Sequence, residues 1–239
     1  INRILTSSVT ALTGSLTTLS DAGISFQKDG KLGLDSTKLQ NAIKDHYNDL
    51  AGLFVAQGLA SDSLIKYVSA TNDTQAGSYA VNITTLATQG KEVGSAAAGL
   101  TITGGSNDTI DITVDGTSGT ITLAAGTYAS ASALATQVQS KINGLSAFSA
   151  AGVSVTVTET SGVLTITSNG YGSGSKVDIT AGNGETNLVG SSATSTVGLN
   201  VAGTINGAAS TGFGQFLTVN AGNTAAGFKV QVTGGSTGS

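Results

Sequence analysis

The residues best suited to chemistry are few in this chain. The only histidine, His46, follows Asp45, and there is no cysteine. Ser-His-Asp and Cys-His catalytic arrangements, and metal sites built on cysteine, therefore lack most of their members. We interpret His46 as a solvated residue on the polar side of a charged helix. The sequence predicts no catalytic residue, no metal site and no cofactor, and hence no enzyme.

Three acids, Asp108, Asp111 and Asp115, cluster around one predicted hairpin and raise the question of Ca²⁺. Calcium takes six to eight oxygen ligands, usually from one tight loop. Here the acids are spread along a strand and a turn, so we interpret them as edge charges that discourage unwanted strand pairing. The glycines match neither GxxxxGK[ST] nor a strand–GxGxxG–helix unit, which argues against a nucleotide site.

Composition narrows the class of protein further. The 239 residues carry a net charge of −4, with 34 glycines and 39% apolar residues. The apolar content argues against disorder, and the absence of a basic cluster argues against binding to nucleic acid. No apolar run approaches the roughly 20 residues that span a bilayer, so we expect no membrane contact. Because the chain starts at Ile1 without a signal peptide, we expect a piece of a longer protein.

The stretch Leu19 to Phe54 is the most charged part of the chain and predicts a hairpin followed by a helix. Short alternating apolar runs, with Ile24 and Phe26 on one side and Leu32 and Leu34 on the other, flank Asp29-Gly30. An Asp-Gly pair in this position is a strong hairpin signal. Asp35-Ser36 then offers a short side-chain oxygen that can cap a helix.

Helical spacing continues on both sides of this hairpin. After Asp35, the residues Leu39, Ile43, Tyr47 and Leu50 predict one apolar helix face. Before the hairpin, residues 2–20 predict a helix with a single apolar stripe. Two helices of this size cannot bury such stripes alone, so we expect the remainder of a parent chain or a partner to cover them.

The rest of the chain is rich in predicted strands. Strands are expected at 64–68, 79–84, 110–114, 121–123, 153–157, 163–166, 177–179, 197–201, 204–205, 216–219 and 228–232. One helix is expected near 130–142, with Asn143-Gly144 as a left-handed stop. This order of elements predicts an α+β fold, with a leg of helix, hairpin and helix and two β-rich head domains. The middle head domain is expected to be one antiparallel sheet with one packed helix.

The same patterns predict three domains. Residues 1–58 form the leg. Residues 59–105 and 195–239 form a discontinuous outer β-rich domain, and residues 106–194 form an α+β domain inserted into it.

The leg also resembles a known family. LSDAGISFQKDGKLGLDSTKLQNAI followed by LAGLF is similar to the C-terminal half of flagellar filament cap proteins, the flagellar hook-associated protein 2 family. The residues that carry this resemblance are Gly23, Ile24, Asp29, Gly30, Leu32, Leu34, Asp35, Lys38, Leu39, Leu53 and Phe54. A shorter stretch ending in Ile142-Asn143 resembles the flagellin hook IN motif found in cap proteins and some flagellins.

The resemblance implies a structural protein of the bacterial flagellum. It implies a homo-oligomeric cap at the distal tip of the filament that promotes flagellin assembly, exported unfolded and located outside the cell. Flagellin, hook–filament junction proteins and an export chaperone are the partners it implies. The alternative is a cell-surface adhesin or glycan-binding β-domain, since Thr/Ser/Asn-rich β-domains are common there. An adhesin has no need of the leg, so residues 1–54 discriminate between the two.

Overall fold

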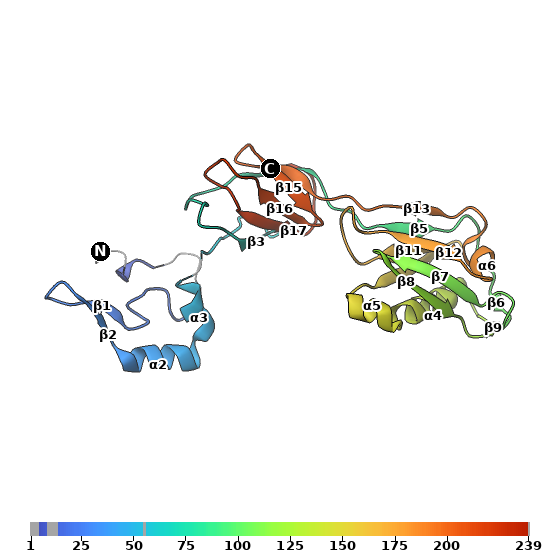
Figure 1. The fold of residues 1–239 in the computed structure, drawn as a ribbon, viewed down its shortest axis with the longest axis horizontal. Helices are drawn as coiled ribbons and strands as arrows, with labels where there is room; N and C mark the ends of the chain where they lie inside the picture. Colours follow the sequence, from blue (N-terminus) through green and yellow to red (C-terminus); the bar gives the residue numbers. More distant parts are fainter. Residues whose placement is uncertain (1–4, 9–13, 55, 239) are drawn as a thin grey trace.

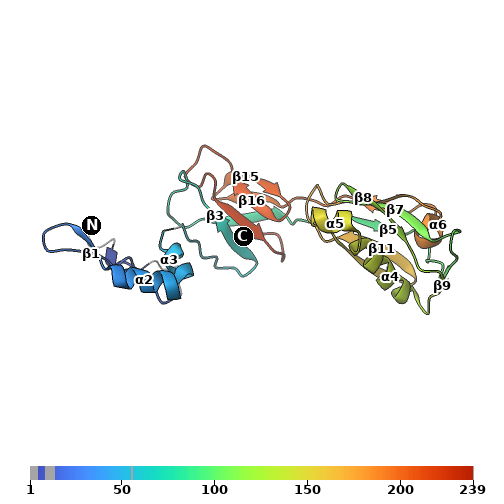
Figure 2. The ribbon, with the colours of Figure 1, turned by 60° about the horizontal axis from the view of Figure 1, so that its bottom comes forward.

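Three parts follow one another along the molecule (Figures 1 and 2). The structure is a computed structural model that describes residues 5–8, 14–54 and 56–238. The leg lies at one end, a six-stranded sheet lies in the middle, and a module with two sheets and three helices lies at the other end. No described helix has both the length and the apolar character needed to cross a bilayer.

The leg contains the predicted hairpin and two short helices. Its elements are β1 (Ile24–Phe26), β2 (Leu32–Leu34), α2 (Ser36–Asp45) and α3 (Tyr47–Gly52). The strands pair antiparallel with Ile24 opposite Leu34 and Phe26 opposite Leu32. Leu16, Ala22, Ala42 and Leu50 form a small buried core, with Leu39 and Leu53 packed against it.

Two expectations for the leg are corrected. The helix expected over 2–20 lies partly outside the described residues, but its described second half, residues 14–20, forms bends and turns. The Asp21 carboxylate accepts the N–H groups of Thr17 and Thr18, and such local bonds compete with helix formation. The second helix breaks at His46, which has φ −140°.

That break changes which side chains are buried. Ile43 and Tyr47, expected on the apolar face, are 49% and 67% exposed. Leu50 is buried as expected, and Ala42 is buried in place of Ile43 and Tyr47, because α3 starts in a new direction after His46.

The six-stranded sheet joins segments from both halves of the chain. Its strand order is β3 (Ile65–Ser69), β17 (Lys229–Val232), β16 (Phe216–Val219), β15 (Ala208–Phe213), β14 (Ala202–Ile205) and β4 (Val81–Thr85), all antiparallel. Its core contains Ile83, Val201, Ile205, Leu217 and Val230 among others. The strand expected at 197–201 is not formed, and this segment is a connection to β14.

The module at the far end contains two antiparallel sheets, where the sequence predicted one. The first has the order β10 (Val155–Thr160), β11 (Val163–Ser168), β5 (Lys91–Val93) and β13 (Thr194–Thr196). The second has the order β12 (Val177–Ala181), β7 (Thr109–Val114) and β8 (Thr117–Thr122). A short pair, β6 (Thr101–Ile102) and β9 (Gly126–Thr127), lies beside them, with helices α4 (Ala131–Asn143), α5 (Ser146–Ala151) and α6 (Glu185–Val189).

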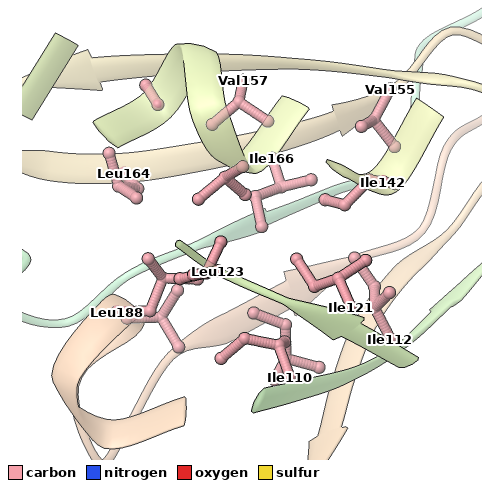
Figure 3. Packing of buried hydrophobic residues seen from close by; sticks show 14 of the residues in the cluster. Ile110, Ile112, Ile121, Leu123, Ile142, Val155, Val157, Leu164, Ile166 and Leu188 are labelled. Atoms are coloured by element: carbon pink, nitrogen blue, oxygen red, sulfur yellow. The ribbon is translucent and has the colours of Figure 1, made fainter. Parts of the chain in front are cut away.

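One continuous core fills the space between these layers. Figure 3 shows Val157, Leu164 and Ile166 on one side of it and Ile110 and Ile121 on the other. The helix α4 buries Leu134, Ala135, Val138 and Ile142, which is the face that the sequence spacing predicts. Helices combined with antiparallel sheets confirm the predicted α+β class.

The strand pairing suggests a change to the expected domain boundaries. β5 pairs with β11 and with β13, although residues 91–93 were assigned to the outer domain. Ala98 and Ile102 also lie in the core of the far module. We propose that the inserted module runs from about residue 91 to residue 196. The short β5 and β6 escaped prediction because they lie in a segment rich in Gly, Ala and Ser.

Glu92 of β5 links the two sheets of the far module. Its side chain is buried, and one carboxylate oxygen accepts the N–H of Ile179 in β12 at 2.6 Å. That N–H is next to an irregularity in the pairing of β12 with β7. Burial raises the pKa of the Glu92 carboxyl, while the Ile179 N–H lowers it and the charges of Asp178 and Glu185 raise it further.

The raised pKa of Glu92 predicts a specific pH dependence of stability. A carboxyl whose pKa is higher in the folded state favours folding most when protonated, and this contribution is lost as pH rises through the folded pKa. Glu92→Gln keeps an acceptor for Ile179 but cannot ionise. We expect the free energy of unfolding of the variant, relative to the parent, to increase between about pH 4 and pH 7. Denaturant unfolding across this range is the measurement, and an equal trend for Glu159→Gln in β10 would contradict the assignment.

The buried face of α4 generates a second prediction. Leu134→Asp places a carboxylate in the core, where an unpaired charge costs several kcal/mol. Ala133→Asp, one residue earlier on the exposed side of the helix, should change stability by about 0.5 kcal/mol or less. Denaturant unfolding of both variants measures the difference, and similar losses would show that the helix does not cover this core.

Candidate assembly segment

The residues of the leg motif are brought together around Gly23 and Asp35. The Asp35 N–H donates to the Gly23 carbonyl at 2.9 Å, which closes the base of the β1–β2 hairpin. The Asp35 carboxylate accepts the N–H groups of Thr37 and Lys38 at 3.0 and 3.1 Å, so it caps α2 as predicted. One residue thus joins the hairpin to the helix.

Gly23 is glycine for two reasons that the structure makes visible. Its φ is +92°, and a Cβ at this position would lie 2.7 Å from the Asp35 carbonyl oxygen. The backbones of the hairpin and the helix therefore approach too closely for any side chain. The sequence motif indicated a glycine here, but this close approach is a tertiary contact that no local pattern reveals.

The turn of the hairpin follows its own local chemistry. Gly30 has φ +86°, and a Cβ there would meet nothing within 4 Å. The Asp29 carboxylate accepts the Lys31 N–H at 3.1 Å, while the Lys31 carbonyl accepts the Gln27 N–H at 2.8 Å. Asp29 and Lys31 also form an exposed ion pair at 3.8 Å, a kind of pair that contributes little to stability.

The electrostatics of the segment centre on Asp21. Its pKa is lowered, first by a hydrogen bond from the Thr18 side chain, then by the N–H groups of Thr17 and Thr18 and by the charge of Lys38. Lys38 is one of the residues that carry the family resemblance. It is exposed, so we assign it no buried contact.

The remaining motif residues of the leg differ in how far they are buried. Leu39 and Leu53 pack against the small core. Leu32, Leu34 and Phe54 are 63%, 58% and 64% exposed. Ile24 is half-buried at the start of β1. A motif that keeps large apolar side chains in solvent is typical of a surface that meets another chain.

The second motif, Ile142-Asn143, lies in the far module and not in the leg. Ile142 is fully buried at the end of α4. The Asn143 amide donates to the Val155 carbonyl at 2.9 Å and accepts the Val155 N–H at 2.8 Å. Gln139, one turn earlier, accepts the N–H of Val157 at 2.8 Å.

These amides cover the free edge of a sheet. β10 is the outer strand of its sheet, so its outward N–H and C=O groups have no neighbouring strand. The side chains of α4 bond to them instead. The expectation that Asn143-Gly144 ends the helix with a left-handed residue is corrected, because Gly144 has φ −81°. The role of Asn143 is its contact with Val155. Sequence patterns that mark the end of a helix do not predict this contact.

The acids weighed as calcium ligands each have local partners. Hydrogen bonding by the Gly105 N–H lowers the pKa of Asp108. Asp111 accepts the Thr120 hydroxyl at 2.6 Å, and Asp115 accepts the Ser168 hydroxyl at 2.6 Å. Within the described ranges, no three His, Cys, Asp or Glu side chains are grouped so that they could hold a metal ion. His46 lies between α2 and α3, with Nδ1 3.8 Å from Asp49.

Comparison with known proteins finds a family match in the first part of the chain. Residues 1–101 match the family described as flagellar hook-associated protein 2 C-terminus. This match agrees with the resemblance of the leg, and residues 1–101 are similar to the C-terminal part of flagellar hook-associated protein 2. The resemblance at Ile142-Asn143 lies outside these residues and stays a prediction. No curated protein matches the chain, and no match supports the adhesin alternative.

Solved structures of flagellar cap proteins show a partial likeness. The D2–D3 domains of FliD from Escherichia coli are 19% identical, with 74% of this chain and 92% of that chain covered and a TM-score of 0.49. FliD from Bdellovibrio bacteriovorus is 13% identical, with 75% and 96% covered and a TM-score of 0.45. FliD from Pseudomonas aeruginosa PAO1 is 22% identical, with 73% and 80% covered and a TM-score of 0.41.

The contact between Gly23 and Asp35 predicts unequal effects of two similar substitutions. An alanine at positive φ costs roughly 1 kcal/mol at either Gly23 or Gly30. Only at Gly23 does the new Cβ also collide with backbone. We expect Gly23→Ala to lower hydrogen-exchange protection of the α2 amides clearly more than Gly30→Ala. Equal protection in the two variants would contradict the proposed junction.

The edge contact of Asn143 predicts a loss of stability in the far module. Asn143→Ala leaves the Val155 N–H and C=O without partners, which costs about 1–3 kcal/mol when such groups are shielded from water. Lys141→Ala, at an exposed position of the same helix, is the control. Denaturant unfolding measures both, and an unchanged midpoint for Asn143→Ala would show that the amide does not support the edge.

Proposed function

We propose that this chain is a segment of a bacterial flagellar filament cap, a structural protein that assembles with copies of itself at the distal tip and promotes flagellin assembly. The family match over residues 1–101 supports this function. The observation that carries it is an apolar surface on the leg that nothing among the described residues covers.

This surface, the hairpin face, consists of Phe26, Leu32 and Leu34. Alternation along a strand and the pairing of Phe26 with Leu32 place these side chains on one side of the hairpin. They are 38%, 63% and 58% exposed. Soluble monomers rarely leave such side chains grouped in water, whereas interfaces bury them.

The leg is poorly stabilised without a further partner. Among the described residues, the core cluster of the leg consists of four buried apolar residues, and two of them are alanines. A unit of some fifty residues buries a small share of its surface and is marginally stable alone. Assembly with a second copy, or with the rest of the parent chain, would cover the hairpin face and would also stabilise the leg.

We propose no catalytic role for the chain. The family is structural, and His46 is placed at a helix junction beside a single carboxylate. We further propose that the protein acts outside the cell, at the filament tip, where flagellin is its partner. Hook–filament junction proteins and an export chaperone are the other partners we propose. The Ser-, Thr- and Asn-rich surface of residues 93–239, with few charges, suits an exposed location.

The hairpin face predicts which substitutions block assembly. Leu32→Glu in the full-length parent protein places a carboxylate in the proposed interface, where desolvation costs several kcal/mol. Each 1.4 kcal/mol lost weakens self-association about tenfold. We expect smaller assemblies in light scattering and reduced motility of cells that carry the variant.

Gln40→Glu is the matched control, because it adds the same charge at an exposed position of α2 in the same leg. It should assemble like the parent. A Leu32→Glu protein that retains the parent's oligomer size and motility would refute the proposed role of the hairpin face.

A further inference from the structure

The junction between the six-stranded sheet and the far module is built from two connecting segments that run side by side. Residues 86–90 lead into the far module and residues 197–201 lead back. The Thr88 N–H donates to the Leu199 carbonyl at 2.9 Å, and the Leu199 N–H donates to the Thr88 hydroxyl at 2.9 Å. The two connections are therefore bonded to each other and not independent linkers.

A loop of the far module, residues 169–176, reaches back onto these connections. The Gly172 N–H donates to the Thr88 carbonyl at 3.0 Å, and the Gly198 N–H donates to the Ser175 carbonyl at 2.9 Å. The Ser175 hydroxyl, which is buried, accepts the Gly90 N–H at 2.7 Å. The loop thus bonds to both connections, the incoming and the outgoing.

Asn200 extends this network to the six-stranded sheet. Its amide oxygen accepts the N–H of Ser173 at 3.0 Å and the N–H of Gly214 at 2.9 Å. Its amide nitrogen donates to the Ser173 hydroxyl at 3.0 Å. Gly214 lies in the turn between β15 and β16, whereas Ser173 belongs to the loop of the far module. A single side chain therefore bonds both modules at once.

Backbone meets backbone in this junction with no room for side chains. A Cβ on Gly172 would lie 2.7 Å from the Gly214 Cα. A Cβ on Gly198 would lie 2.4 Å from the Thr88 carbonyl oxygen and 2.6 Å from that of Gly172. Contacts this close resemble the interior of one domain more than a hinge between two.

The loop is itself held firmly in the far module. The Asp115 carboxylate accepts the Lys176 N–H at 2.8 Å and the Ser168 hydroxyl at 2.6 Å, one at each end of the loop. The Ser175 hydroxyl also donates to the Gly170 carbonyl at 2.9 Å within it. A movement of the loop relative to its own module would break these bonds.

We infer that the loop 169–176 and Asn200 form a clasp that makes the six-stranded sheet and the far module one rigid body. Domains joined by small polar contacts normally move relative to each other. Here motion would require breaking hydrogen bonds from two directions, including the buried bond from Gly90 to Ser175, and separating close-packed glycines. The head therefore keeps a fixed orientation between its near and far ends.

Residual dipolar couplings of the labelled 239-residue chain test the clasp. In the parent, we expect the couplings of both modules to fit one alignment tensor. Asn200→Ala removes the side chain that joins the modules. Gly198→Val adds a side chain where the connection 197–201 meets the connection 86–90 too closely to hold one. We expect at least one of these variants to require two different tensors, while the chemical shifts of both cores stay unchanged.

Asn220→Ala is the control, because the Asn220 amide accepts the Thr211 hydroxyl at 2.7 Å within the six-stranded sheet and does not cross the junction. It should keep one tensor. The inference is overturned if the parent already needs two tensors, if both junction variants keep one, or if the control separates the modules as well.

Discussion

The pairing of β3 with β17 and of β4 with β14 is the contact on which the rest of the head depends. It joins segments that lie far apart in the sequence. The residues of the far module lie between these segments along the chain. The entropy of closing such a long loop grows only slowly with its length, so a large module can be accommodated once the ends meet. The same pairing delays folding, because these strands cannot form until distant residues find each other.

Burial is distributed unevenly along the molecule. The far module has a continuous apolar core and an edge strand that is bonded by side-chain amides. In the part of the leg that the structure describes, the core cluster has four residues and the hairpin face is exposed. This gradient suits a division of roles in which the head is complete by itself and the leg gains its stability from assembly. The segment with the least core is also part of the region that matches the cap family.

Local patterns in the sequence predicted local structure well. The Asp-Gly turn, the cap at Asp35 and the buried face of α4 all depend on residues within a few positions of one another, and all three are present. Contacts between distant residues were beyond reach. The close approach of Gly23 to Asp35, the bond of Asn143 to Val155 and the burial of Glu92 beside Ile179 each need a tertiary neighbour that no spacing encodes. The short strand β5 was not predicted for the same reason, since it is a strand only through its pairing with partners distant in the sequence.

The Asn143 amide that covers β10 is also a candidate for slow deamidation. An asparagine followed by glycine is the pair whose side-chain nitrogen is lost most readily by slow cyclisation and hydrolysis, and Asn143 is followed by Gly144. The product would place a charged carboxylate 2.9 Å from the Val155 carbonyl, where a donor stood before. Two acceptors would then face each other at the Val155 carbonyl, while the bonds that the Val155 and Val157 N–H groups donate to α4 could remain. Ageing of this one residue would thus weaken the cover of the β10 edge at the Val155 carbonyl.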